Sequence, residues 1–134
     1  VNVHIEEKKA ISGSETIFLP STHQVIRALA EEILNSAGYR VLSCSNGREA
    51  LELYQLHGDT VDLVLLDIVM PEIGGFEVAE SIMEINPEAR ILFSSGYSDR
   101  STSKRISGKM DSSWILRKPY ARNEMLETIR RILT

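Results

Sequence analysis

The chain has 134 residues, of which 43% are hydrophobic and 25% are charged, and its formal net charge is -4 at pH 7. This length fits one domain with a core of its own, and the composition is ordinary for a globular protein. A pI near 5.4 gives no basic surface for nucleic acid, and no apolar stretch approaches the roughly 20 residues that span a bilayer. We therefore expect a cytoplasmic domain that contacts neither nucleic acid nor membrane.

The N-terminal segment differs from the rest of the chain. Residues 1–15 are polar, with Gly and Ser near their end, which is typical of a linker. The chain also opens on Val1 and not on Met. We expect residues 1–15 to be a linker or the end of a preceding domain, and residues 16–134 to form the folded domain of a longer protein.

Short apolar runs alternate with helical patterns from Thr16 onward. The runs that predict strands are 16–19, 39–43, 61–66, 91–94 and 114–117. Strands that alternate with helices predict an α/β fold with a parallel sheet. Pro20 has no N–H for a sheet ladder, so we expect sheet pairing of the first strand to end there.

Each predicted strand is followed by a segment with a helical pattern, and all but one of these segments are clearly amphipathic. The first predicted helix, 24–37, ends before Gly38, a natural residue after a helix, and its spacing places these side chains inward: Val25, Ile26, Leu29, Ile33 and Leu34. The second begins with Asn46 and Glu49 spaced as a capping box and carries inward Ala50, Leu51, Leu53 and Tyr54. Further helices are predicted at 76–85 and 123–133. Residues 98–110 hold few apolar side chains, so we expect a short or mobile helix there.

The single cysteine, Cys44, lies at the end of a predicted strand. It has no partner for an internal disulfide, which agrees with a reducing compartment. We expect it to be a small core residue without chemistry.

Polar side chains follow several predicted strands. Asp67 ends the run 61–66, Ser94 ends the next strand, and Lys118 follows the last one. Because the carboxyl ends of parallel strands meet at one edge of a sheet, these residues are expected to converge. A carboxylate can form an aspartyl phosphate where a nearby cation neutralises the phosphoryl charge. Each of these residues alone also fits a structural role. For Asp67, that role is a side-chain hydrogen bond to the backbone of the turn that follows it.

From about residue 15 to residue 134 the chain resembles the receiver domain of bacterial response regulators and hybrid histidine kinases. Three ordered segments carry the resemblance: the run 63–71 (LVLLDIVMP) followed by Gly74 and Gly75, the run 92–97 (LFSSGY), and Lys118-Pro119-Tyr120. The resemblance implies a flavodoxin-like, doubly wound (βα)5 fold with strand order 2-1-3-4-5.

The resemblance also implies roles for individual residues. Asp67 would be the phosphoacceptor, Ser94 the hydroxyl that turns toward the phosphoryl group, and Lys118 the lysine that pairs with it. Val69 would offer its backbone carbonyl to Mg²⁺. The partners would be a histidine kinase or an adjacent kinase domain, and a downstream output domain or protein.

The chain departs from the family pattern after the first strand. The family has a pair of acidic residues there that hold Mg²⁺, and Ser21 and Thr22 occupy those positions. Mg²⁺ prefers anionic oxygen, and only Asp67 supplies a formal negative charge. We expect Mg²⁺ to bind weakly or not at all, and phosphotransfer to be slow unless Lys118 or His23 compensates. A second departure is Ile115, with Trp114 before it, where the family has an aromatic residue.

Two functions follow as hypotheses. The first is a receiver module of a two-component phosphorelay that accepts a phosphoryl group on Asp67 and is not itself an enzyme, beyond assisting its own phosphorylation and dephosphorylation. The second is a degenerate pseudo-receiver that binds partners independently of phosphorylation. A hydrolase that works through an aspartyl intermediate would need an acid two residues after Asp67, where Val69 stands.

Overall fold

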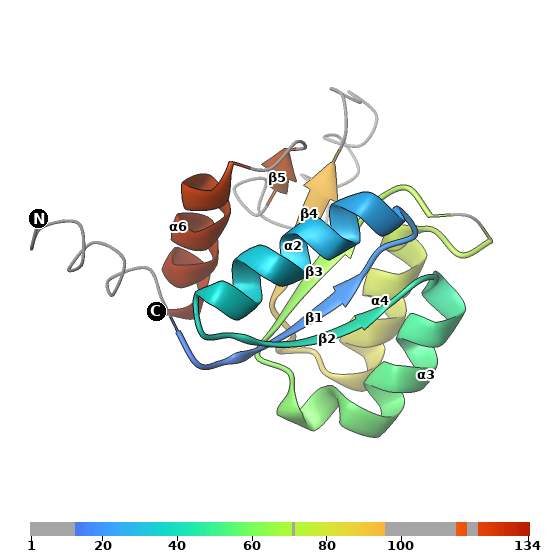
Figure 1. Cartoon of the computed structure of the whole chain (residues 1–134). Coiled ribbons are helices and arrows are strands. Elements are labelled where there is room, and N and C mark those ends of the chain that lie inside the picture. The colour runs from blue at the N-terminus through green and yellow to red at the C-terminus, as the bar shows by residue number, and fades with distance from the viewer. Residues whose placement is uncertain (1–12, 71, 96–114, 118–120) are drawn as a thin grey trace, which may run out of the picture.

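The computed structural model describes residues 13–70, 72–95, 115–117 and 121–134. Parallel strands alternate with helices along the chain (Figure 1). The elements are β1 (Thr16–Pro20), α2 (Gln24–Ser36), β2 (Arg40–Cys44), α3 (Gly47–His57), the 3-10 turn η1 (Gly58–Thr60), β3 (Leu63–Asp67), α4 (Gly75–Ile85), β4 (Ile91–Ser95), β5 (Ile115–Arg117) and α6 (Arg122–Leu133). The strands form one sheet in the order β2-β1-β3-β4-β5, which confirms the predicted fold class and strand order. The expected helix at 98–110 and Trp114 lie outside the described residues.

Helices cover both faces of the sheet. Figure 1 shows α2 and α6 over one face, and α3 and α4 over the other. Alternate residues of β3 enter separate cores: Leu63 and Leu65 pack with side chains of α2 and α6, whereas Val64 and Leu66 pack with side chains of α3 and α4. A strand covered on both faces needs a continuous apolar run, and this is what the sequence of β3 supplies.

The predicted inward face of helix α2 is confirmed at Ile33 and Leu34 but is wrong in the first part of the helix. Val25 is 74% exposed and Leu29 is 44% exposed, so their predicted inward positions are wrong. The buried side chains are those of Ala30, Ile33 and Leu34. The apolar residues of this helix form two overlapping stripes, and the stripe that contains the small Ala30 lies against the sheet. A small side chain lets the helix axis approach the strands more closely than Leu29 would.

Pro20 does not end the pairing of β1 on both sides. Toward β2 the register continues to Pro20 and Cys44, and the Ser21 N–H donates to the Cys44 carbonyl at 3.0 Å. Toward β3 the register runs only to Phe18 and Val64. Backbone groups of successive strand residues point to opposite neighbours, so the missing N–H of Pro20 falls on the β3 side. The prediction was correct for β3 and wrong for β2.

The helix ends follow the predicted signals closely. The Asn46 side chain accepts a hydrogen bond from the Glu49 N–H at 2.9 Å, as in a capping box. The Glu49 carboxylate accepts from the N–H of Ser45 and not of Asn46, so the reciprocal bond is shifted by one residue. After α2, Gly38 has a φ of 99°, a conformation that side chains with a Cβ rarely adopt.

An ion pair joins the start of the described chain to the last helix. The Arg130 guanidinium of α6 donates to the Glu15 carboxylate and, at 3.4 Å, to the Tyr39 hydroxyl. The Arg40 N–H donates to the Glu15 carbonyl at 3.0 Å. The hydrogen bond with Arg130 lowers the pKa of Glu15 from 4.5 to about 2. This pair therefore fixes the chain ahead of β1 against α6.

Replacing Glu15 by Gln is expected to lower the free energy of unfolding by about 1 kcal/mol at neutral pH, because the two charge-assisted hydrogen bonds from Arg130 lose their anionic acceptor. A lowered folded-state pKa stabilises the protein above pH 4.5, and this contribution disappears as the pH falls toward 2. Urea denaturation should thus show the difference between wild type and Glu15→Gln shrinking from about pH 5 to about pH 3.

The matched control is Glu52→Gln, at an exposed position of α3. Its unfolding free energy should stay within about 0.5 kcal/mol of wild type at both pH values. A Glu15→Gln difference that does not change with pH would contradict the assignment.

Candidate functional site

Asp67 is the last residue of β3 and is buried, with 4% of its surface exposed. Its Oδ1 accepts a hydrogen bond from the Val69 N–H at 3.2 Å, a bond within the turn that follows the strand. The Ile68 N–H donates to the Ser94 carbonyl at 3.1 Å, which extends the ladder between β3 and β4 one residue past Asp67. The strand thus holds the carboxylate firmly at the carboxyl edge of the sheet.

Asp67 shares a row with hydroxyl side chains from the strands on either side. In the β3–β4 register Asp67 lies opposite Ser94, which is 1% exposed. The Phe18–Val64 register, continued by three residues along both strands, brings Ser21 level with Asp67. The sequence reasoning placed Asp67 and Ser94 together, and the register confirms that neighbourhood.

These three side chains also share a face of the sheet. Successive side chains of a strand alternate between faces, so Asp67 lies on the face of Leu65, Ser94 on that of Leu92, and Ser21 on that of Leu19. Leu19, Leu65 and Leu92 belong to the core under α2 and α6. Ser21, Asp67 and Ser94 therefore form a polar row at the end of one apolar layer, and we call these three residues the strand-end row.

Lys118, the predicted cation of the site, lies outside the described residues. The register of β5 reaches Ser94–Leu116 and Ser95–Arg117, so the described chain stops one residue before Lys118. Its role stays a prediction.

The loop after β3 is packed closely against the backbone of Asp67. A Cβ on Gly75 would lie 2.3 Å from the Asp67 carbonyl oxygen and 2.7 Å from the Ile68 Cα. The Gly75 N–H donates to the Ile68 carbonyl at 2.9 Å, and Glu72 has a φ of 67° in the left-handed region. Val69 is 75% exposed, and its N–H donates to Asp67 Oδ1. Its predicted carbonyl contact with a metal stays a prediction.

Ser21 and its neighbours occupy the positions of the expected acidic pair. Ser21 is 4% exposed, and its Oγ has no hydrogen-bond partner in the described part of the chain. The Arg27 guanidinium of α2 donates to the Ser21 carbonyl at 2.6 Å. Thr22 is half-buried, and His23 is exposed at the N-cap of α2.

Arg27 was not singled out from the sequence. A signal was nonetheless present, because a cation near a helix N-terminus is electrostatically unfavourable unless another group holds it. Arg27 lies in the fourth position of α2, and the Ser21 carbonyl is the group that holds it. The pair fixes the loop between β1 and α2.

Cys44 has the predicted structural role. It is buried in the core under α3 and α4, and its thiol donates to the Asn46 carbonyl at 3.7 Å. Burial is the main cause that raises its pKa to about 11. A thiol with so high a pKa is a poor nucleophile, so Cys44 adds no chemistry to the site.

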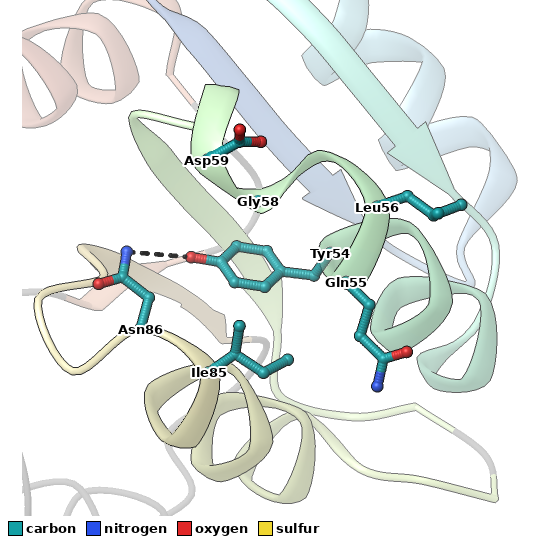
Figure 2. Close-up of a pocket in the computed structure, with 7 residues that line it drawn as sticks. All are labelled: Tyr54, Gln55, Leu56, Gly58, Asp59, Ile85 and Asn86. Atoms are coloured by element: carbon teal, nitrogen blue, oxygen red, sulfur yellow. Dashed lines mark hydrogen bonds between the residues drawn. The ribbon is translucent and has the colours of Figure 1, made fainter.

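A cavity of about 410 Å³ lies at the other edge of the sheet, where α3 and α4 end (Figure 2). Tyr54 lies across it, and the Asn86 side-chain amide donates to the Tyr54 hydroxyl at 3.4 Å. Leu56 and Ile85 line the rim and are largely exposed. This cavity belongs to the amino edge of the strands and is remote from Asp67.

The geometry defines a class of protein. A doubly wound parallel sheet presents one buried carboxylate at the tip of its central strand, next to a buried hydroxyl on the neighbouring strand. This arrangement is that of an α/β domain that does its chemistry outside the carboxyl edge of the sheet.

The chain belongs to the response regulator receiver domain family, whose sequence model matches residues 17–130. It is 29% identical to the sensor kinase CckA of Brucella abortus over 96% of this chain and 14% of that kinase. It is 31% identical to the receiver protein CpdR of the same organism, over 87% of this chain and 95% of CpdR. A receiver domain from Clostridium thermocellum superposes with a TM-score of 0.80 at 20% identity, covering 89% of this chain and 94% of that one.

Family membership fixes the broad function of the chain. It is a receiver domain of two-component signalling, and the pseudo-receiver hypothesis is not favoured. Receiver domains are signalling modules and not classical enzymes, and they interact with histidine kinases and output domains. The chain spans only 14% of the length of CckA. Within the described residues, no helix combines the length and the apolar character that crossing a membrane requires.

Receiver domains generally bind Mg²⁺ in an acidic pocket. Asp67 supplies one carboxylate, whereas Ser21 and Thr22 supply neutral hydroxyls. Among the described residues no group of three His, Cys, Asp or Glu side chains could hold a metal. Mg²⁺ relies on anionic oxygen to offset the loss of its hydration shell, so this donor set is a poor site for it.

Replacing Gly75 by Ala is expected to lower the free energy of unfolding by about 1–3 kcal/mol, because the added Cβ overlaps backbone that cannot rotate away. The matched control is Gly74→Ala. A Cβ on Gly74 would lie 2.6 Å from the Glu77 carboxylate, a flexible side chain that can move, and 3.9 Å from the Ile68 carbonyl oxygen, which is an ordinary contact distance. Urea denaturation should place Gly74→Ala within about 0.5 kcal/mol of wild type. Equal destabilisation by both substitutions would contradict the close packing of the loop on Asp67.

Proposed function

We propose that Asp67 is the phosphoacceptor of this receiver domain and takes its phosphoryl group from a histidine kinase. The observation that carries this proposal is the position of Asp67, a buried carboxylate at the tip of β3 and opposite Ser94 in the register. A carboxylate whose position is fixed by the strand and by the Val69 N–H is oriented for attack on phosphorus.

The reaction is a transfer between nitrogen and oxygen. An Oδ atom of Asp67 forms a bond to phosphorus while the P–N bond of a phosphohistidine breaks. The imidazole nitrogen leaves with that electron pair and takes up a proton, and the product is an acyl phosphate on Asp67. Catalysis of such a transfer consists almost entirely of positioning and charge stabilisation, so the domain only assists its own phosphorylation and dephosphorylation.

Ser94 and Lys118 complete the proposed site. The Ser94 hydroxyl, one strand away from Asp67, would hydrogen-bond a phosphoryl oxygen and report its presence. Lys118 would pair with the phosphoryl group as a point charge. The conformational change that follows phosphorylation would be recognised by an output domain or protein. The kinase that donates the phosphoryl group would be a separate protein or an adjacent domain of the same chain.

The remaining features of the proposal concern metal, location and other partners. Mg²⁺ binds weakly or not at all, because Ser21 and Thr22 replace carboxylates. The domain works in the cytoplasm, and residues 1–15 are a linker or the end of a preceding domain. With a net charge of -4, it contacts neither nucleic acid nor membrane.

Incubation with phosphoramidate, followed by intact-mass measurement, is expected to add the mass of one phosphoryl group to wild type and none to Asp67→Asn. Asn at this position keeps the shape of the side chain and removes the nucleophilic oxygen charge. The control is Asp59→Asn, at an exposed site in η1, which should gain mass as wild type does. A mass gain on folded Asp67→Asn equal to that of wild type would refute Asp67 as the acceptor.

A further inference from the structure

The Ser21 hydroxyl is an unusual group for a buried position. The Ser21 N–H donates to the Cys44 carbonyl, and its carbonyl accepts from Arg27, so both backbone groups are satisfied. The Oγ atom is buried and has no hydrogen-bond partner in the part of the chain that the structure describes. A buried donor without a partner carries a free-energy cost, which a ligand that accepts its hydrogen bond would relieve.

The place of Ser21 indicates what that ligand is. Ser21 lies in the strand-end row, level with Asp67 and on the same face of the sheet. The β1–β3 register ends at Phe18 and Val64, so the strands separate before Ser21 and Asp67, and a phosphoryl group on Asp67 would extend the carboxylate by one P–O unit into the space between them. A phosphoryl oxygen on Asp67 is therefore the acceptor that the row brings within reach of the Ser21 hydroxyl.

The charge around Asp67 supports the same conclusion. In the acidic pocket expected for the family, three carboxylates and one bound Mg²⁺ sum to a single negative charge. In this chain Asp67, Ser21 and Thr22 also sum to a single negative charge, without a metal. The Arg27 guanidinium adds a positive group beside Ser21. Replacing the two acids by hydroxyl residues thus removes the ligands of the metal. It also removes the repulsion between those acids and an anionic phosphoryl donor, which the metal would otherwise offset.

The start of α2 adds no negative charge to this edge. Its first turn holds no acidic residue, and its N-cap His23 makes no side-chain capping bond. The N–H groups of a helix N-terminus favour anions, so this end of α2 is compatible with a nearby phosphoryl group.

We infer that Asp67 accepts its phosphoryl group without a divalent metal and that the Ser21 hydroxyl donates a hydrogen bond to a phosphoryl oxygen in its place. This inference rests on the proposed function. The atoms balance as in the transfer above: Asp67 oxygen bonds to phosphorus, the P–N bond of a phosphohistidine or phosphoramidate breaks, and the leaving nitrogen takes the electron pair and a proton. Ser21 keeps its own proton throughout and acts as a positioning donor.

The test uses the whole chain with phosphoramidate and follows intact mass with time, in Mg²⁺ and in EDTA. Wild type should gain mass at the same rate in both. Ser21→Ala should react about tenfold to a hundredfold more slowly in EDTA, because a donor to the phosphoryl oxygen is lost. The matched control Ser81→Ala, in the middle of α4, should react as wild type does.

A second variant restores the missing acids. Ser21→Asp/Thr22→Asp should react at least about tenfold more slowly than wild type in EDTA, owing to like-charge repulsion, and recover in Mg²⁺. Calorimetric titration with Mg²⁺ gives a readout independent of transfer: heat of binding is expected for this double variant and not for wild type. Circular dichroism confirms that each variant is folded.

The possible outcomes separate the two proposals. Phosphorylation of wild type that requires Mg²⁺ would overturn the metal-independent inference and leave Asp67 as the acceptor. An unchanged rate for folded Ser21→Ala in EDTA would overturn the role of Ser21. No mass gain under either condition, together with a folded chain, would overturn the proposed function and the inference with it.

Discussion

The structure depends on the burial of β3 between two helical layers. Leu63 and Leu65 fill one core, and Val64 and Leu66 fill the other. A slip of one residue would exchange these two sets between the faces and carry Asp67 into a core, so the register of β3 is strongly specified. The same constraint sets the position of the carboxylate, because the apolar run ends where the layers end. The Asp67 side chain is thus positioned by the packing of apolar residues that precede it in β3.

The register of β3 also determines which groups lie beside Asp67. Its partner in β4 is Ser94, and the β1–β3 register ends at Phe18, two residues before Pro20. The missing N–H of Pro20 falls where the two strands separate, so Pro20 presents no unpaired backbone N–H to the space next to Asp67. Ser21 follows directly and remains held by β2 through the Cys44 carbonyl. A residue that is unfavourable inside a sheet is therefore well suited to open a site between two strands.

Much of this architecture could be predicted from local patterns. The apolar runs located the strands, Gly38 and Asn46 marked helix ends, and the position of Asp67 after a continuous apolar run indicated a strand tip. These features depend on residues close in sequence. The exposure of Val25 and Leu29 in α2 could not be predicted in this way, since the two apolar stripes of this helix differ only in how well they fit the sheet.

Contacts between distant segments were equally inaccessible to pattern reasoning. The pair of Glu15 and Arg130 joins residues at opposite ends of the described domain, and its formation requires β1 and α6 to be in place. The hydrogen bond from Arg27 to the Ser21 carbonyl joins residues that are close in sequence, but it depends on the path of the loop after Pro20. The hydrophobic periodicity of a sequence does not indicate which charged side chains pair with one another. Such pairs are therefore found only in the folded structure.

The exchange of acids for hydroxyls bears on how the domain is controlled. A receiver whose site is assembled around Mg²⁺ couples three equilibria: metal binding, phosphoryl transfer and the conformational shift. With Ser21 and Thr22 in place of carboxylates, the first of these loses its ligands while Asp67 and Ser94 keep their places in the row. Under the proposed metal-independent transfer, the phosphorylation state of Asp67 would respond to the phosphoryl donor alone. A metal ion stabilises a phosphoryl group mainly by neutralising its charge. Hydroxyl donors stabilise it by directed hydrogen bonds, which fix its orientation but neutralise little of its charge.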